Sequence, residues 1–99
     1  MKDDRKILVV GSANVDMVVK SAKIPRTGET VLGGVFSKHE GGKGANQAVA
    51  AKTLFENTAF CAGLGDDDIG RSYLEYLVER GMDVSLVKIC KGAHTGVAL

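Results

Sequence analysis

Two polar side chains follow the first apolar run of the chain. Residues 6–10 (KILVV) lead into Gly11, and Asn14 and Asp16 come shortly afterwards. Open α/β sheets bind ligands at the carboxyl ends of their strands, so this position favours a binding site. Residues two apart in an extended chain point to the same side, so Asn14 and Asp16 could together hold adjacent hydroxyl groups of a sugar. The alternative is a turn at a strand end, where Asn and Asp commonly bond to the local backbone.

A glycine-rich segment, residues 40–47 (EGGKGANQ), leads into an alanine-rich one. Its three glycines allow a ligand to approach the backbone, and the start of the following helix offers unpaired N–H groups and a partial positive charge. These features suit an oxygen-rich or anionic ligand. Lys43 would add a donor, and Asn46 could turn its amide toward the same space. The alternative is a turn into the helix that leaves Lys43 in solvent.

The glycine-rich segment does not match either common nucleotide-binding pattern. In a P-loop alignment, Ser37 stands where the first glycine is needed and Gly44 stands where Ser or Thr is needed. In the dinucleotide pattern begun at Gly42, Gln47 occupies the place of the last glycine.

The acidic segment at residues 63–70 (GLGDDDIG) is best explained as the start of a helix. A calcium loop would need Asp or Asn at position 70, where Gly70 stands. A Gly-x-Gly-Asp anion hole is geometrically possible at such a strand-to-helix turn. A helix N-cap with an acidic first turn explains the same residues more simply.

The other potential metal ligands are too scattered to suggest a metal site. Cys61, Cys90, His39 and His94 show no close paired spacing, which argues against zinc. Both cysteines lie in apolar runs, so we expect them to be reduced and structural.

The composition and charge of the chain argue against several further classes of protein. The 99 residues are 44% hydrophobic and 25% charged, with a formal net charge of +1, as in an ordinary globular protein. Without a basic stripe, nucleic acid and acidic membranes are not expected partners. The first apolar run is too short for a signal peptide or a spanning helix, so we expect a cytoplasmic protein.

The pattern of apolar runs and turn residues predicts strands that alternate with helices. An antiparallel pair of strands is inserted after the first strand. The expected strands are 6–11, 16–20, 30–36, 58–63, 84–89 and 95–99, and the expected helices are 44–54 and one from 66 to about 80. This order predicts a layered α/β fold with right-handed crossovers. The first helix should end near Phe55, with Asn57 as a candidate left-handed cap. Because the sequence stops within the apolar run 95–99, we expect it to be part of a longer chain.

Several of these segments, in this order and spacing, resemble the ribokinase (PfkB) family of carbohydrate kinases. They span nearly the whole chain, and the most specific is the amino-terminal signature of that family at residues 41–48. The segments are 11–16 (GSANVD), 28–30 (GET), 41–48 (GGKGANQA), 65–70 (GDDDIG) and 95–98 (TGVA).

The resemblance implies a partial Rossmann-like, ribokinase-type α/β fold with a small β-sheet lid. Residues 1–99 would be the amino-terminal part of that domain. The lid strands would lie at about 14–36 and 95–99, and the α/β core at 5–13 and 41–90. In ribokinases the lid covers the sugar and mediates dimer formation, so a homodimer through the lid sheet is expected.

The resemblance also implies where a sugar, ribose above all, would bind. Asp16, Lys43 and Asn46 would make the main side-chain contacts. The full set of expected substrate-binding residues is Asn14, Val15, Asp16, Gly42, Lys43, Gly44, Ala45 and Asn46.

The catalytic half of such an enzyme has no counterpart in these residues. In the family, the catalytic base is an Asp in a distal Gly-Ala-Gly-Asp stretch beside the sites for ATP, Mg²⁺ and a monovalent cation such as K⁺. No catalytic or metal-binding residue is therefore expected here, and these sites should lie beyond residue 99. A non-catalytic sugar-binding or dimerisation fragment remains the main alternative, and a phosphate-binding nucleotide domain is a third.

Overall fold

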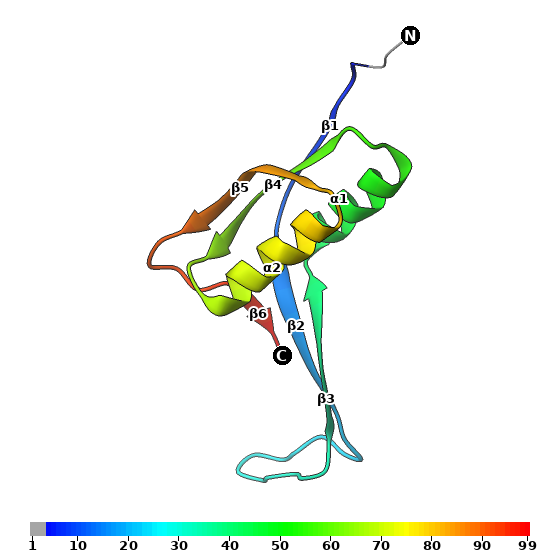
Figure 1. Cartoon of the computed structure of the whole chain (residues 1–99). Helices are drawn as coiled ribbons and strands as arrows, with labels where there is room; N and C mark the ends of the chain where they lie inside the picture. Colours follow the sequence, from blue (N-terminus) through cyan, green and yellow to red (C-terminus); the bar gives the residue numbers. More distant parts are fainter. Residues whose placement is uncertain (1–3) are drawn as a thin grey trace.

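The computed structural model describes residues 4–99 as an α/β fold with two three-stranded sheets. Figure 1 shows the elements in chain order. They are β1 (Ile7–Val10), β2 (Asn14–Lys20), β3 (Val35–Gly41), α1 (Lys43–Leu54), β4 (Thr58–Gly65), α2 (Asp68–Glu79), β5 (Asp83–Cys90) and β6 (Gly96–Ala98).

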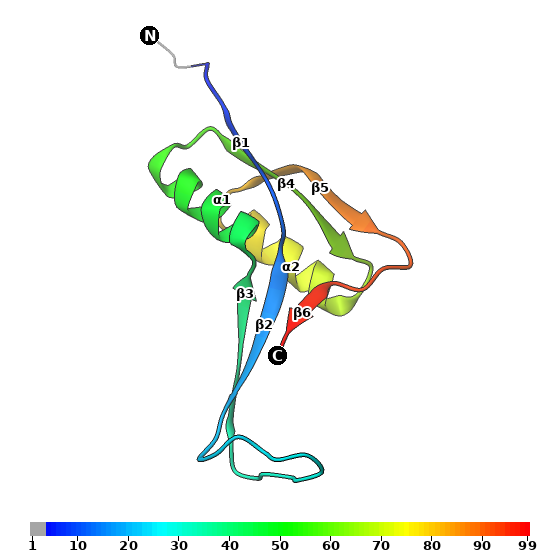
Figure 2. The ribbon, with the colours of Figure 1, turned by 180° about the vertical axis from the view of Figure 1, so that it is seen from behind.

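The central sheet consists of β1, β4 and β5 in the order β1-β4-β5, with all strands parallel. Both helices pack on the same face of this sheet, as the two opposite views in Figures 1 and 2 show. Parallel strands need long crossover connections, and here α1 and α2 provide them on either side of β4. The carboxyl ends of β1 and β4 therefore lie at the same edge of the sheet.

The outer sheet consists of β3, β2 and β6 in that order. Strands β2 and β3 pair antiparallel from Asn14 opposite Gly41 to Lys20 opposite Val35, whereas β6 pairs parallel with β2. The β2–β3 hairpin extends away from the helices (Figure 1), and the molecule is elongated, with principal-axis extents of 62 × 31 × 19 Å. The outer sheet is thus attached to the central sheet at one end only.

The core lies between the central sheet and the two helices. Phe60 on β4 and Leu77 on α2 are fully buried, and Tyr73 is 1% exposed. On α1 the inward residues are small, with Ala45 and Ala48 buried, so the helix can approach the sheet closely. On α2 the buried pair Tyr73 and Leu77 lies four residues apart, on one helical face.

The prediction for the third strand is wrong in position. The sequence suggested 30–36, but β3 runs from Val35 to Gly41, so the outer sheet extends past the expected boundary at residue 36. Gly28 and Gly33 adopt positive φ angles of 75° and 83°, which favours turns over a continuous strand. Residues 37–40 (SKHE) are polar and form a strand because they pair with β2.

The prediction for the end of the first helix also needs correction. No residue other than glycine among 4–99 has a positive φ, so Asn57 is not a left-handed cap. Phe55 ends α1 in an extended conformation, and its N–H donates to the carbonyl of Ala51 at 2.7 Å. The Asn57 amide instead donates to the carbonyl of Arg5 at 2.6 Å, which holds the chain leading into β1.

Within the described part of the chain, neither helix has the length and apolar character needed to cross a membrane.

We predict that Leu77→Ala lowers the free energy of unfolding by about 2–5 kcal/mol, because it leaves a cavity at a fully buried site. Leu54→Ala is the matched control, since Leu54 also lies on a helix but is 88% exposed. It should change stability by less than about 0.5 kcal/mol. Urea unfolding followed by circular dichroism measures both, and equal losses would contradict this packing.

Candidate functional site

The loop after β1 and the start of α1 are in direct backbone contact. A Cβ atom on Gly44 would lie 2.6 Å from the Cα of Gly11, so no side chain fits between the two segments. The N–H of Ala45 donates to the carbonyl of Ser12 at 2.9 Å, which fixes the contact. The two segments that the sequence singled out therefore meet at one place.

Asn14 and Asp16 lie side by side at the start of β2. The Asn14 amide donates to a carboxylate oxygen of Asp16 at 2.8 Å, and both residues are half-buried. The carboxylate lies against Gly41, where a Cβ atom would come within 2.5 Å of Oδ2. Asp16 is therefore held by its neighbours on β2 and β3, and a carboxylate with about four acceptor positions keeps capacity for hydroxyl groups.

Gly42 makes the sharp change of direction from β3 into α1. Its φ of 105° is a conformation that side chains other than glycine rarely adopt. A Cβ at this position would also lie 2.7 Å from the carbonyl oxygen of Ser12. Because α1 has no capping side chain, the N–H groups of its first turn are not occupied by a local carboxylate or hydroxyl.

The predicted site residues differ in what their side chains can do. Lys43 and Asn46 are exposed, whereas Asn14, Asp16 and Gly42 are half-buried. Val15 is 4% exposed and Ala45 is 2% exposed, so both side chains belong to the core. Gly44 is buried against Gly11. At Val15, Gly44 and Ala45, then, only backbone atoms could reach a ligand.

A hollow of about 310 Å³ lies away from this place, beside the carboxyl-terminal ends of α1 and α2. No predicted site residue lines it; its walls are Val49, Lys52, Thr53, Glu56, Arg80 and Met82. Asn14 and Asp16 lie instead beside Gly41 and Gly42, at the other end of α1.

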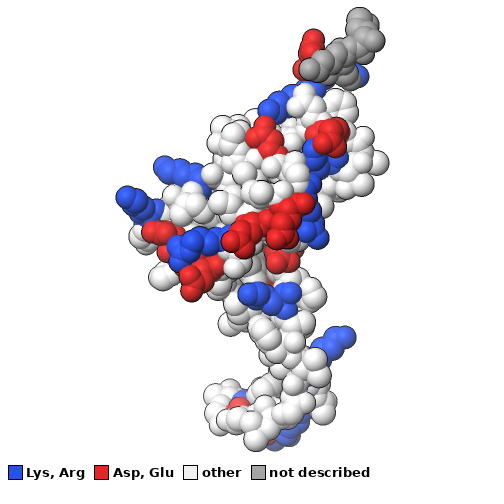
Figure 3. Space-filling model, in the orientation of Figure 1, with Lys and Arg blue, Asp and Glu red and all other residues white. Residues whose placement is uncertain are grey.

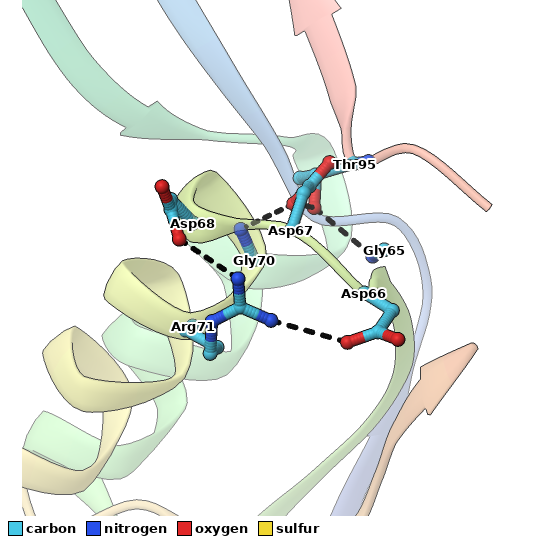
Figure 4. Close-up of polar contacts among 7 residues, drawn as sticks. All are labelled: Gly65, Asp66, Asp67, Asp68, Gly70, Arg71 and Thr95. Carbon is cyan, nitrogen blue, oxygen red and sulfur yellow. Dashed lines mark hydrogen bonds and ion pairs between the residues drawn. The ribbon is translucent and has the colours of Figure 1, made fainter. Parts of the chain in front are cut away.

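The acidic segment forms a helix N-cap, as the sequence predicts. Asp67 is the N-cap of α2, and its carboxylate accepts from the N–H of Gly70 at 2.7 Å. Arg71 bonds to Asp66 at 3.1 Å and to Asp68 at 2.8 Å (Figure 4). All of these contacts lie within the loop that precedes α2 and the first turn of that helix.

The Asp67 carboxylate also holds the residue before β6, which the sequence did not predict. It accepts from the hydroxyl of Thr95 at 2.7 Å and from the N–H of Thr95 at 2.8 Å. The same hydroxyl accepts from the N–H of Gly65 at 3.0 Å (Figure 4). These bonds join the end of β4 and the start of α2 to the outer sheet.

The bonds to Asp67 favour its charged form. The Thr95 hydroxyl, the Thr95 N–H and the Gly70 N–H together lower the pKa of Asp67 from 3.8 to about 2. The carboxylate is thus ionised at all physiological pH values and serves as a permanent acceptor.

Among residues 4–99, no three His, Cys, Asp or Glu side chains are grouped so that they could hold a metal ion.

We predict that Gly44→Ala destabilises the protein by about 1–3 kcal/mol, because the new methyl group would overlap the backbone of Gly11. Gly63→Ala is the control, since a Cβ there would meet only the Cys90 sulfur, at 3.4 Å. Thermal unfolding should separate the two variants, and a Gly44→Ala protein as stable as wild type would show that the loops are not in close contact.

We also predict a specific pH dependence for Asp67→Asn. The folded pKa of Asp67 is about 2, so its stabilising effect is complete above about pH 3.8 and is lost as the pH falls toward 2. Asn can still cap the helix, but its amide cannot accept both bonds from Thr95. The variant should be less stable than wild type at pH 6, and the difference should shrink below about pH 4.

Urea unfolding at pH 6, 4 and 3 measures this effect. Asp68→Asn is the control, because the Asp68 side chain is 99% exposed and pairs only with Arg71 across the same turn. A stability difference between wild type and Asp67→Asn that stays constant with pH would rule out the proposed role of the Asp67 charge.

The sequence and the fold both resemble known proteins. The model of the pfkB family of carbohydrate kinases matches residues 4–99. Ribokinase of Bacillus subtilis (strain 168) is 42% identical over 94 residues, which cover 95% of this chain and 32% of the relative. Ribokinase of Mus musculus is 37% identical over 92 residues, which cover 93% of this chain and 28% of the relative.

Solved structures show the same fold. Ribokinase of Arabidopsis thaliana, complexed with ribose and ATP, has a TM-score of 0.84 at 35% identity, over 93% of this chain and 30% of that one. Ribokinase of Cryptococcus neoformans, in complex with ADP, has a TM-score of 0.76 at 36% identity, over 93% of this chain and 29% of that one. The chain therefore spans about a third of the length of the relatives it matches. By sequence and by fold, it belongs to the pfkB family of carbohydrate kinases.

Proposed function

We propose that the protein is an ATP-dependent kinase that transfers the γ-phosphate of ATP to a hydroxyl group of a sugar, with ribose as the substrate. The observation that carries this proposal is the contact between the Asn14–Asp16 pair and the glycine turn at Gly41 and Gly42. The relatives named ribokinase, one of them with ribose and ATP bound, support the same substrate class.

In this proposal the 99 residues supply the sugar-binding half of the active site. Asp16 accepts hydrogen bonds from two sugar hydroxyls, and Asn14 orients the carboxylate through the bond at 2.8 Å. Lys43 and Asn46, both exposed at the start of α1, close over the sugar from the other side. Gly42 and Gly44 leave the backbone accessible at that point.

We further propose that the outer sheet acts as a lid and as the interface of a homodimer. Its hairpin carries apolar side chains that are open to solvent, with Val19 63% exposed and Phe36 61% exposed. On the face shown in Figure 3, the hairpin has few charged groups compared with the region of α2. Strand β3 is also an edge strand, so its outward N–H and C=O groups could pair with a second copy.

The phosphoryl-transfer half is proposed to lie outside these residues. Residues 4–99 hold no group of three His, Cys, Asp or Glu side chains that could bind a metal ion, and the glycine-rich segment does not match a P-loop. Phosphoryl transfer depends mainly on positioning and charge stabilisation around the phosphate. We therefore assign sugar binding, and no catalytic step, to this part. We also propose a cytoplasmic location, where ATP is abundant.

The test is ribose-dependent release of ADP by the complete gene product, with Asp16→Asn as the variant. This variant keeps the size of the side chain but removes the charge that strengthens bonds to hydroxyls. Because each such bond is worth about 1.5–3 kcal/mol, the KM for ribose should rise roughly 10- to 100-fold, with the KM for ATP unchanged.

Glu75→Gln is the control, since Glu75 is exposed on α2 and should leave both KM values unchanged. An unaltered KM for ribose in Asp16→Asn would refute the role of Asp16. Ribose binding by calorimetry without any turnover would favour the alternative, a sugar-binding protein without kinase activity. Stabilisation by ATP but not by ribose would favour a nucleotide-binding domain.

A further inference from the structure

The hydroxyl group of Tyr73 reaches the glycine turn from a different element. Tyr73 lies on α2 and is 1% exposed, and its hydroxyl donates to the carbonyl of Gly41 at 2.6 Å. The two residues are 32 positions apart in the sequence. This bond is the direct polar link between α2 and the residue at which β3 ends.

The other side of Gly41 is occupied by the proposed sugar-binding residues. Gly41 pairs with Asn14 across the outer sheet, and its Cα faces the carboxylate of Asp16. Gly41 is itself buried. The residue is thus held between Asp16 on one side and the Tyr73 hydroxyl on the other.

The chain direction changes immediately after this anchored carbonyl. Gly42 follows with a φ of 105°, and α1 begins at Lys43. The carbonyl of Gly41 and the N–H of Gly42 belong to one rigid peptide plane. A bond that fixes this carbonyl therefore also fixes the orientation in which Gly42 and Lys43 leave the strand.

We infer that Tyr73 is a positioning residue for the sugar site. Its hydroxyl fixes the orientation of the Gly41–Gly42 peptide plane and thereby the position of Lys43 relative to Asp16. This inference rests on the proposed sugar-kinase function. Tyr73 does not touch the sugar, because its side chain is buried in the core beneath the turn.

The surroundings of the phenol keep it in the form that donates. Burial, together with Tyr76, Glu40 and Asp16, raises the pKa of Tyr73 well above its ordinary value of 10. The hydroxyl thus stays protonated throughout the working pH range. The ring is held separately by an edge-to-face contact with Tyr76 at 5.7 Å between centroids.

Tyr73→Phe tests the inference, because it removes the hydroxyl and keeps the ring in the core. In the complete gene product we expect the KM for ribose to rise roughly tenfold, because a buried carbonyl loses its partner and the turn relaxes. The KM for ATP should change by less than about twofold. Tyr76→Phe is the matched control, since Tyr76 lies on the same helix and is only half-buried, and it should leave the KM for ribose unchanged.

Amide hydrogen exchange provides a second readout that does not depend on activity. In Tyr73→Phe, the amides of Gly42, Lys43 and Gly44 should exchange faster than in wild type, whereas those of β4 should not change. Unchanged exchange at the turn, or a lower melting temperature with an unaltered KM for ribose, would reduce Tyr73 to a packing residue and overturn the inference.

Failure of the proposed function would look different. A wild-type protein that neither binds nor phosphorylates a sugar would overturn the proposed function, and the positioning role with it, before any variant is compared. A wild-type enzyme active on ribose, with a Tyr73→Phe variant of equal KM and equal exchange, would overturn the positioning role alone.

Discussion

The contact between Gly11 and Gly44 is the constraint on which the rest of the site depends. A Cβ on either residue would lie within 2.8 Å of the other, so the loop after β1 and the first turn of α1 can meet only as bare backbone. With this distance fixed, β2 must start directly beside the end of β3. Asp16 then lies against Gly41, and the loop after β1 and the glycine turn are in contact although they are far apart in the sequence.

The same region also connects the two sheets, and two side chains of α2 make that connection. Tyr73 holds the end of β3 through Gly41, and Asp67 holds the residue before β6 through Thr95. Because β6 pairs with β2 at Asn14 and Asp16, both anchors act on strands that carry or flank the proposed sugar ligands. The helix thus supports the outer sheet at two points, while the distal hairpin projects beyond either contact (Figure 2).

The sequence predicted those features whose cause is local. The strand at residues 7–10, the small inward face of α1 and the Asp67 cap all follow from patterns within a few residues. The apolar run at 7–10 suggests a buried strand, but Leu8 is 48% exposed and Val10 is 70% exposed, so that part of the prediction is wrong. Strand β3 was misplaced because residues 37–40 (SKHE) have no apolar alternation, and only pairing with β2 makes them a strand. The bonds from Asp67 to Thr95 and from Tyr73 to Gly41 span 28 and 32 residues, and a single sequence holds no signal for such partners.

The two helix starts differ in the side-chain acceptors that are available to their first N–H groups. The positive end of α2 is already satisfied, because Asp67 caps it and Asp68 adds a second carboxylate in its first turn. The positive end of α1 has neither a capping side chain nor an acidic residue in its first turn, and a glycine with φ of 105° precedes it. An external oxygen-rich group is stabilised most at a helix start where no internal carboxylate competes for the N–H groups. The Asp16 carboxylate comes from another strand, lies against Gly41 and accepts a bond from Asn14.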